Sequence, residues 1–464
     1  MHSRPSRWIL VGTILGSGAV FVEGSVTMVA LPAIANDFHL GIAGLQWVLN
    51  GYLLTLSALM LLGGALGDRF SRRGVFAIGL MGFSIASLAC ALAPNLLVLV
   101  AARVLQGAAG ALVVPNSLAL LETTFSGPER GAAVGHWAAW SAVSSAFGPL
   151  VGGWLVDAAS WRWVFVCIAP FAAAAVVAVG VGRNAREPDA AKPDVDYAGA
   201  ALVTLGLAGV VGALIAGPDA GFTTPAVLLA GIGGLALLVA FVAVERRSTS
   251  PLVPLDIFRD RQFTGVNATT LVVYAALNGL FFLLMLQLQG VLGYSALQAG
   301  ASLLPINVLM VTLSPVAGRL AARVGPRLLM TGGSLVAAIG MLLFARVHPG
   351  ARYATSVLPP AIVFGVGLAS FVAPLTSVAL GALGERRAGL ASGVNNAVAR
   401  LAGLLAVAVL PLAAGLGGAQ TLRGGVVASG FARAMMICAA LCAAGSVISA
   451  VTIRGGPAHE QVRR

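Results

Sequence analysis

Glu23 and Arg103 are ionisable residues inside long apolar stretches of this chain, and their types and positions suit acid–base chemistry. Glu23 lies in the run FVEGSVTMVALP, Phe21–Pro32, with no charged neighbour in sequence, and Arg103 lies in the later run Leu96–Ser117. Hydrocarbon does not solvate a carboxylate, so such an acid must be protonated, paired with a base or open to a water-filled cavity. Each of these states is compatible with reversible proton exchange.

The composition of the chain is that of a membrane protein. Of its 464 residues, 58% are hydrophobic and only 9% are charged, against about 25% charged in a soluble domain. The net charge of +12 does not indicate nucleic-acid binding, because the basic residues are scattered over short loops and form no single patch. The four cysteines lie in apolar runs without a neighbouring His or acid, which predicts small core residues and no metal site.

The elements that must position Glu23 and Arg103 are membrane-spanning helices. Apolar runs of about 20 residues are long enough to cross a bilayer, and a helix satisfies the backbone there. Fourteen such runs predict an all-α polytopic membrane protein: Trp8–Leu31, Leu45–Leu66, Val75–Ala93, Leu96–Ser117, Gly131–Val156, Trp163–Val181, Tyr197–Ala216, Thr224–Val244, Gly265–Leu288, Ala299–Ala321, Leu328–Ala345, Ala354–Ala379, Leu390–Leu412 and Ala434–Ile453.

The charges between these runs predict the orientation of the chain. An even number of spans puts both ends on one side of the membrane, and that side carries most of the 28 Lys and Arg residues. The opposite side carries only Arg162, Arg346, Arg352, Arg423 and Arg433. Because positively charged loops stay in the cytoplasm, both termini are predicted to be cytoplasmic.

Glu23 and Arg103 are predicted to lie at similar depth. Spans one and four run in opposite directions, and each residue lies roughly 5 Å outward of the midplane at the helical rise per residue. A pair can therefore form if the two helices face one cavity. Burial favours the protonated acid and a neighbouring arginine favours the carboxylate, so together they can poise Glu23 for proton exchange. A static structural ion pair is the alternative.

The spans also indicate internal organisation. Two polar, proline-containing stretches, Arg183–Asp196 and Glu245–Gln262, bracket spans seven and eight. The predicted domains are therefore an N-terminal six-helix bundle at 1–182, a linker with two inserted helices at 183–262, and a C-terminal six-helix bundle at 263–464. Gly64–Arg73 after span two and Gly318–Arg327 at the end of span ten share Gly, Leu and Arg at a constant offset, which indicates weak internal symmetry.

Several motifs in the first half carry a resemblance to a known family. They are GALGDRFSRR (Gly64–Arg73), RVLQG (Arg103–Gly107), GPLVGG (Gly148–Gly153), ALP (Ala30–Pro32), QWVLNGY (Gln46–Tyr52) and WRWVF (Trp161–Phe165). In this order and spacing, the chain resembles the major facilitator superfamily, specifically its fourteen-span drug:proton antiporters. The resemblance covers nearly the whole chain and implies two six-helix bundles plus two inserted helices.

The resemblance implies a role for each motif. Glu23 would bind the coupling proton and Arg103 would tune it. The loop residues would form a gate whose contacts are made in one conformational state and broken in the other: Gly64, Asp68, Arg69, Arg72 and Arg73. The antiporter motif would bend span five and admit a neighbouring helix: Gly148, Pro149, Gly152 and Gly153. A plain positively charged loop and a plain packing kink are the alternatives.

The chain departs from the family pattern at four positions. Glu23 stands where the family usually has Asp, and Ser71 replaces the usual Gly of the loop motif. Ala322 in the second copy stands where the first copy has Asp68, and Ser144 stands where the antiporter motif often has a further Gly. No second acid lies deep in a predicted span, which disfavours dicationic substrates.

Polar and aromatic residues within spans are candidates for a substrate cavity, because rings offer adaptable surface to lipophilic compounds. Packing between helices is the alternative for each of them. They are Asn50, Tyr52, Asn116, Trp137, Trp140, Tyr274, Asn278, Phe281, Gln287, Asn307, Asn395 and Asn396.

These features predict a proton-coupled antiporter that exports lipophilic cationic or neutral drugs by alternating access. No phosphate-binding GxxxxGK[ST] loop is present, so no ATP-driven step is expected. No nucleophile–base pair indicates enzyme chemistry, and no cofactor besides protons is expected. The expected partners are small lipophilic substrates and the lipid bilayer, with a monomeric protein in a bacterial cytoplasmic (inner) membrane. A dedicated exporter of one antibiotic, metabolite or lipid is the first alternative, and a transport-inactive receptor or scaffold is the second.

Overall fold

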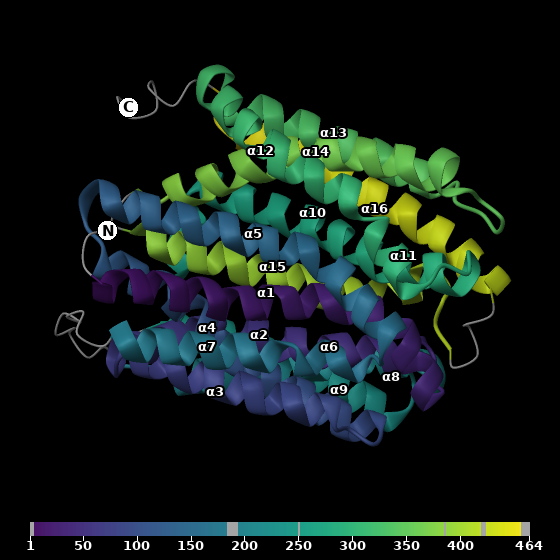
Figure 1. Ribbon diagram of the computed structural model, residues 1–464, viewed down its shortest axis with the longest axis horizontal. Coiled ribbons are helices and arrows are strands. Elements are labelled where there is room, and N and C mark those ends of the chain that lie inside the picture. Colours follow the sequence, from purple (N-terminus) through teal and green to yellow (C-terminus); the bar gives the residue numbers. More distant parts are fainter. Residues whose placement is uncertain (1–3, 183–193, 249–250, 385–386, 419–423, 456–464) are drawn as a thin grey trace. The chain divides into compact units, whose positions relative to one another are not determined.

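The computed structural model describes the chain except for residues 1–3, 183–193, 249–250, 385–386, 419–423 and 456–464. The described part is built from helices and contains no strand (Figure 1). Thirteen of its helices are long and apolar enough to cross a membrane. The helix α5, Gly127–Ala158, has 32 residues and coincides with the remaining predicted span. The prediction of an all-α polytopic fold is therefore confirmed.

The chain divides into two compact units, residues 1–40 with 44–253 and residues 41–43 with 254–464. The other helices of the first unit are α1 (Arg4–Phe38), α2 (Ile42–Arg69), α3 (Arg72–Ala91), α4 (Leu96–Thr124), α6 (Arg162–Val166), α7 (Ile168–Val181), α8 (Tyr197–Ala220) and α9 (Pro225–Glu245). The second unit contains η2 (Leu255–Arg259), α10 (Arg261–Leu286), η3 (Gln287–Val291), α11 (Ala296–Ala301), α12 (Leu304–Val324), α13 (Pro326–Phe344), η4 (Tyr353–Val357), α14 (Leu358–Gly381), α15 (Ala388–Ala413) and α16 (Gly424–Thr452).

Polar side chains define where several helices begin. Ser71 is the N-cap of α3 and accepts a hydrogen bond from the backbone N–H of Gly74 at 3.1 Å. Asn95 caps α4 in the same way, through Val98, at 3.0 Å. Such caps satisfy backbone donors that the first helical turn leaves unpaired. The serine that departs from the family loop motif therefore has a structural role at the start of α3.

The helix α1 lies at the centre of the packing in the first unit, where it contacts α4, α5 and α7. Small residues allow this close approach. A Cβ on Gly12 would lie 3.1 Å from the backbone oxygen of Ala175 in α7, so a larger residue there would force the helices apart. Glu23 is carried by this central helix. In the second unit, α10 packs against α15 and α16, and α13 packs against α14 and α16.

The inserted pair predicted as spans seven and eight forms α8 and α9, which pack against each other. Both group with the first unit. A Cβ on Gly212 of α8 would lie 3.5 Å from the indole of Trp47 in α2, so the pair also contacts this unit's helices. The predicted division at 182/183 and 262/263 stays a prediction, and most of the polar stretch Arg183–Asp196 lies outside the described residues.

Candidate functional site

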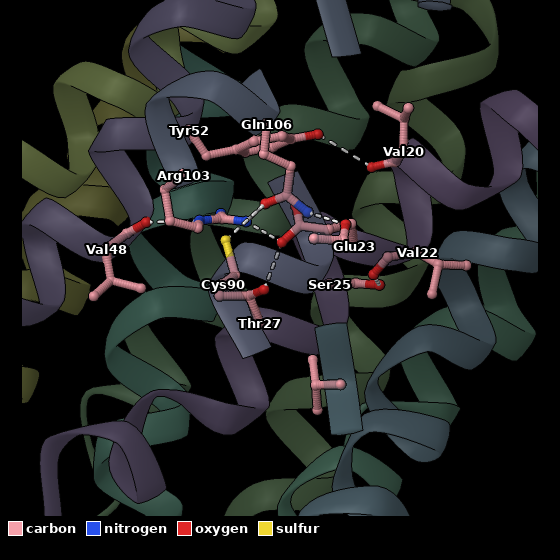
Figure 2. Close-up of polar contacts among 12 residues, drawn as sticks. Val20, Val22, Glu23, Ser25, Thr27, Val48, Tyr52, Cys90, Arg103 and Gln106 are labelled. Atoms are coloured by element: carbon pink, nitrogen blue, oxygen red, sulfur yellow. Dashed lines mark hydrogen bonds and ion pairs between the residues drawn. The ribbon is translucent and has the colours of Figure 1, made fainter. Parts of the chain in front are cut away.

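Glu23 and Arg103 meet in the interior of the first unit. Both side chains are 0% exposed, and Arg103 Nη1 donates to Glu23 Oε1 in a buried ion pair (Figure 2). The hydroxyl of Thr27, one helical turn further along α1, donates to the same oxygen at 2.7 Å. One carboxylate oxygen therefore receives both a charged and a neutral hydrogen bond.

The guanidinium of Arg103 is held from several directions. Its Nε donates to the backbone oxygen of Val48 in α2 at 2.9 Å, and its Nη1 also donates to Gln106 Oε1 at 2.7 Å. The ring of Tyr52 lies under the guanidinium, with 4.4 Å between Arg103 Cζ and the ring centroid. The Tyr52 hydroxyl in turn donates to the backbone oxygen of Val20 at 3.3 Å. These contacts compensate a positive charge that no water reaches.

Close helix contact brings these groups together. A Cβ on Gly107 would lie 2.2 Å from the backbone oxygen of Tyr52, so only glycine fits at this point of the α2–α4 contact. The segment Arg103–Gly107 thus supplies the charge of Arg103, the amide of Gln106, and a glycine at 107 that lets α2 approach closely. The amide Nε2 of Gln106 donates to Ser87 Oγ in α3 at 2.6 Å.

Two polar atoms of the pair are left over. Glu23 Oε2 and Arg103 Nη2 are buried and have no hydrogen-bond partner within the described part of the chain. Buried carboxylate oxygens usually have a hydrogen-bond donor, so this oxygen is an exception. The arrangement can accept a proton at Oε2 while Arg103 keeps Val48 and Gln106 as acceptors.

The antiporter motif lies against α1 beside this site. Gly148 faces Ser25, since a Cβ added to Gly148 would lie 1.9 Å from Ser25 Oγ. Gly152 faces Val26, since a Cβ added to Gly152 would lie 3.0 Å from Val26 Cα. Pro149 lies inside α5, which continues through it, and Gly153 is buried. Two glycines one turn apart thus let α5 approach α1 within three residues of Glu23.

The predicted gate residues form ion pairs within the first unit. Asp68 Oδ1 accepts from both Nε and Nη2 of Arg72, at 2.9 and 2.6 Å. Arg69 Nη1 pairs with Asp194 Oδ1 at 3.3 Å, which connects the loop to the segment just before α8. A Cβ on Gly64 would contact Pro115 at 3.6 Å. Arg73, the last residue of the motif, lies in the first turn of α3.

The structure places many of the predicted cavity residues of the first unit in helix–helix contacts. Asn50, Tyr52 and Asn116 are at most 2% exposed. The Asn116 amide donates to the backbone oxygen of Gly63 in α2 at 2.8 Å, and Tyr52 stacks on Arg103. Trp137 is half-buried and donates to Ser17 Oγ in α1 at 2.9 Å, whereas Trp140 is 54% exposed.

The predicted cavity residues of the second unit lie on α10, η3, α12 and α15. Asn395 of α15 donates to Asn267 Oδ1 at 3.2 Å and to Thr270 Oγ1 at 2.8 Å, both in α10. Asn278 bonds the backbone oxygen of Tyr274, and Phe281 meets Phe364 edge-on with ring centroids 6.4 Å apart. Asn307 is half-buried and Asn396 is exposed, while Gln287 is 0% exposed and donates to the backbone oxygen of Val347.

Two direct partners of the ion pair, Thr27 and Gln106, and one residue behind them, Ser87, were not assigned roles by the sequence. Thr27 and Gln106 follow Glu23 and Arg103 by four and three residues, and this spacing brings side chains together on a helix. Their position was therefore available as a signal. Ser87 lies in a different helix, and its hydroxyl within an apolar run gives no comparable indication.

Comparison with known proteins agrees with this architecture. The family model of the Major Facilitator Superfamily matches residues 13–407. The MFS-type transporter EfpA of Mycobacterium tuberculosis is 36% identical over 413 residues, 88% of this chain and 77% of its own. The puromycin resistance protein pur8 of Streptomyces alboniger is 36% identical over 412 residues, covering 88% and 81%. The multidrug resistance protein Stp of Mycobacterium tuberculosis is 33% identical over 418 residues, covering 88% and 76%.

Solved structures share the fold. A bacterial homologue of the human lysosomal transporter Spinster, inward-facing and unoccupied, matches with a TM-score of 0.69 over 99% of this chain and 100% of its own, at 17% identity. The chain belongs to the Major Facilitator Superfamily. It is a multi-pass membrane protein of a transporter family, and its relatives are transporters rather than enzymes.

Proposed function

We propose that this protein exports lipophilic cationic or neutral compounds in exchange for protons. The observation that carries the proposal is the buried pair of Glu23 and Arg103, whose carboxylate keeps one oxygen without a donor. The names of the relatives pur8 and Stp, which refer to puromycin and multidrug resistance, support drug efflux.

The proposed mechanism couples two events at Glu23. In the charged state, Arg103 and Thr27 hold the carboxylate, and a cationic substrate nearby is also attracted to it. Protonation at Oε2 removes this attraction and leaves Arg103 on its other acceptors, Val48 and Gln106. Proton binding and substrate binding then oppose each other, which is the requirement for exchange by alternating access.

The loop and the antiporter motif have supporting roles in this proposal. The ion pairs of Asp68 with Arg72 and of Arg69 with Asp194 would bias one conformational state. Asp68→Asn is then expected to lower turnover several-fold with drug binding retained, and unchanged turnover would count against a gate. Gly148 and Gly152 would hold α5 against α1 beside Glu23, and this close contact would prevent leakage of protons or substrate between the two helices.

The predicted cavity residues divide between lining and support. Trp137, Trp140, Tyr274, Phe281 and Asn396 keep exposed or half-buried surface, which is compatible with substrate contact. The buried residues Tyr52, Asn116 and Gln287 suit packing instead, because their described contacts are within one unit. The proposal includes a bacterial cytoplasmic membrane, cytoplasmic termini, a monomer and no cofactor besides the proton.

The test is uptake of ethidium, a lipophilic monocation, and of puromycin into inverted proteoliposomes with an acidic interior. Glu23→Gln is expected to abolish pH-driven uptake, because the amide cannot exchange a proton. Asp37→Asn is the matched control, since Asp37 lies on the same helix and pairs with Arg162 at 2.8 Å with 43% exposure. The proposal is wrong if Glu23→Gln still accumulates either compound at the native rate.

Export of one dedicated compound is the second candidate function. A probable actinorhodin transporter from Streptomyces coelicolor is 34% identical to this chain over 417 residues, covering 87% of this chain and 72% of its own. The name of this relative refers to a single compound, which favours a dedicated exporter as the second candidate for this chain. Competition separates the two: many unrelated compounds inhibit ethidium uptake by a multidrug exporter, whereas a dedicated exporter is inhibited by one class.

A further inference from the structure

The amide of Gln106 connects the ion pair to a third helix, α3. Its Oε1 accepts from Arg103 Nη1 at 2.7 Å, and its Nε2 donates to Ser87 Oγ at 2.6 Å. Gln106, Ser87 and Arg103 are each 0% exposed. The chain of contacts from Glu23 through Arg103 and Gln106 to Ser87 therefore crosses α1, α4 and α3 without solvent.

The two ends of an amide are chemically different, so its orientation affects Arg103. The oxygen accepts and the NH₂ group only donates, whereas a guanidinium only donates. The amide oxygen must therefore face Arg103, and the NH₂ group then needs an acceptor elsewhere in the interior. Ser87 Oγ supplies that acceptor. Cys90 Sγ lies 3.8 Å from the other end of the amide, Gln106 Oε1, where it is a weak donor. It therefore does not serve as an acceptor for the NH₂ group.

We infer that Ser87 is a positioning residue for proton exchange at Glu23. By holding the NH₂ end of Gln106, it keeps the amide oxygen on Arg103 Nη1, the same nitrogen that donates to Glu23. Nη1 carries two hydrogens and donates one to the carboxylate and one to the amide, so both acceptors compensate the guanidinium charge. The inference rests on the proposed function, because it requires that Glu23 takes up and releases a proton.

The direction of the effect follows from this compensation. Without Ser87 Oγ, the Gln106 NH₂ group has no acceptor and the amide rotates or withdraws. The buried Arg103 charge then loses one of its compensating acceptors and depends more on Glu23, which favours the carboxylate over the protonated acid. Transport should need a lower pH to protonate Glu23. One neutral hydrogen bond corresponds to an acid shift of about 0.5–1 pH unit in the midpoint of the activity profile.

The experiment measures ethidium uptake by full-length protein in proteoliposomes across a pH series, together with the apparent KM. Ser87→Ala should shift the midpoint to lower pH by the amount given. Ser87→Thr keeps a hydroxyl acceptor and should restore the native midpoint, while Ser87→Cys, a weak acceptor of similar size, should shift it less than alanine does. Ser84→Ala is the control, because Ser84 lies half-buried on the same helix.

The outcomes separate this inference from the proposed function. A Ser87→Ala protein whose rate falls by one factor at every pH, with an unshifted midpoint, overturns the positioning role. A shift of the same size in Ser87→Thr overturns it too. If the wild type shows no midpoint that depends on Glu23, the proposed function itself fails. Should Ser87→Ala fold poorly in thermal unfolding, Ser87→Cys alone decides, since an unshifted midpoint there contradicts the inference.

Discussion

Glu23 and Glu245 are two buried carboxylates of the first unit, and the protein surrounds them in opposite ways. Glu23 is 0% exposed in the middle of α1 and pairs with the side chains of Arg103 and Thr27. Glu245 is 3% exposed at the end of α9. Its two oxygens accept from the backbone N–H groups of Leu252 and Val253, each at 3.2 Å.

The difference lies in what the second oxygen does. Both oxygens of Glu245 are occupied by backbone donors, so this carboxylate fixes the course of the chain at Val253, the last residue of the first unit. One oxygen of Glu23 is without a donor. Burial of an acid therefore does not by itself indicate proton chemistry. Glu23 combines a charged side-chain partner with an oxygen that has no donor among the described residues, and the proposed proton exchange depends on this combination.

A second acid sharpens the contrast. A Cβ on Gly199 would lie 2.7 Å from Asp196 Oδ2 and 3.1 Å from Glu245 Oε1, so both carboxylates face this glycine. Asp196 is also the N-cap of α8, through Gly199 N–H at 2.7 Å. Glu245 thus has a like-charged neighbour, where Glu23 has an arginine. The backbone donors offset this repulsion at the end of the α8–α9 pair.

The largest effect is expected from removing the base of the Glu23 pair. Arg103→Leu leaves a buried carboxylate without its partner, a loss of about 3–5 kcal/mol for a buried pair. Yield and thermal stability in detergent should both fall. The double variant Glu23→Gln with Arg103→Leu should recover much of the stability, because neither charge then remains, but no driven ethidium uptake. Equal instability of the single and double variants would contradict the coupling of the two residues.

The packing around Glu23 provides the next test. Gly152→Ala places a methyl group 3.0 Å from both Cα and Cβ of Val26, so α1 and α5 must give by a few tenths of an ångström at this contact. Overpacking of this kind costs about 1–3 kcal/mol. Thermal unfolding should shift down and driven uptake should fall with it. Gly135→Ala on the same helix is the matched control, because nothing lies within 4 Å of its added Cβ. Equal effects of the two variants would refute the close contact.

Glu245 should affect stability and leave proton coupling intact. Glu245→Ala removes the acceptors of two backbone N–H groups, and an unsatisfied buried donor costs about 1–3 kcal/mol. Glu245→Gln keeps one carbonyl acceptor and should lose less. The measurements are thermal unfolding and the pH midpoint of ethidium uptake per folded molecule, with the exposed Glu122→Ala as control. A shifted midpoint with unchanged stability would make Glu245 resemble Glu23 and remove the contrast.

The sequence predicted one of these acids and missed the other for a physical reason. Glu23 is recognisable because a helix position far from both ends of a span is remote from bulk water, where a charged side chain is costly. Glu245 lies at the border of a span and a polar stretch, where composition indicates solvent. Its burial depends on how the backbone at Leu252 and Val253 turns back onto α9. Such a contact leaves no periodic pattern in the sequence from which it could be predicted.

The same reasoning applies to the other site residues. Span positions and the Glu23–Arg103 depth follow from apolar length and helical rise, so they were predictable. Polar residues within spans were not separable into lining and packing. Asn116 illustrates this, because its amide donates to the backbone oxygen of Gly63 in the facing helix α2. This contact depends on the residue opposite, which the type of residue at position 116 does not reveal. Ser87 was missed for the same reason.

The smallest effect is expected at an exposed acid, which gives a lower limit for the comparison. Asp256 pairs with Arg387 at 2.8 Å in the second unit, with side chains 52% and 53% exposed. The hydrogen bond from Arg387 lowers the pKa of Asp256 below its ordinary value of 3.8. Because the folded pKa is depressed, the pair stabilises the protein above pH 3.8 and this contribution disappears as the pH falls through the lowered pKa.

Asp256→Asn should therefore lower the unfolding temperature only slightly at pH 7, since solvent screens exposed pairs. The difference from the wild type should persist down to the ordinary pKa and vanish below the lowered one. Thermal unfolding of both proteins in detergent over this pH range measures it, with Arg387→Gln expected to behave like Asp256→Asn. A large loss at neutral pH would mean that exposed pairs stabilise this protein as strongly as buried ones, and burial would then not distinguish Glu23 and Glu245 from the other acids.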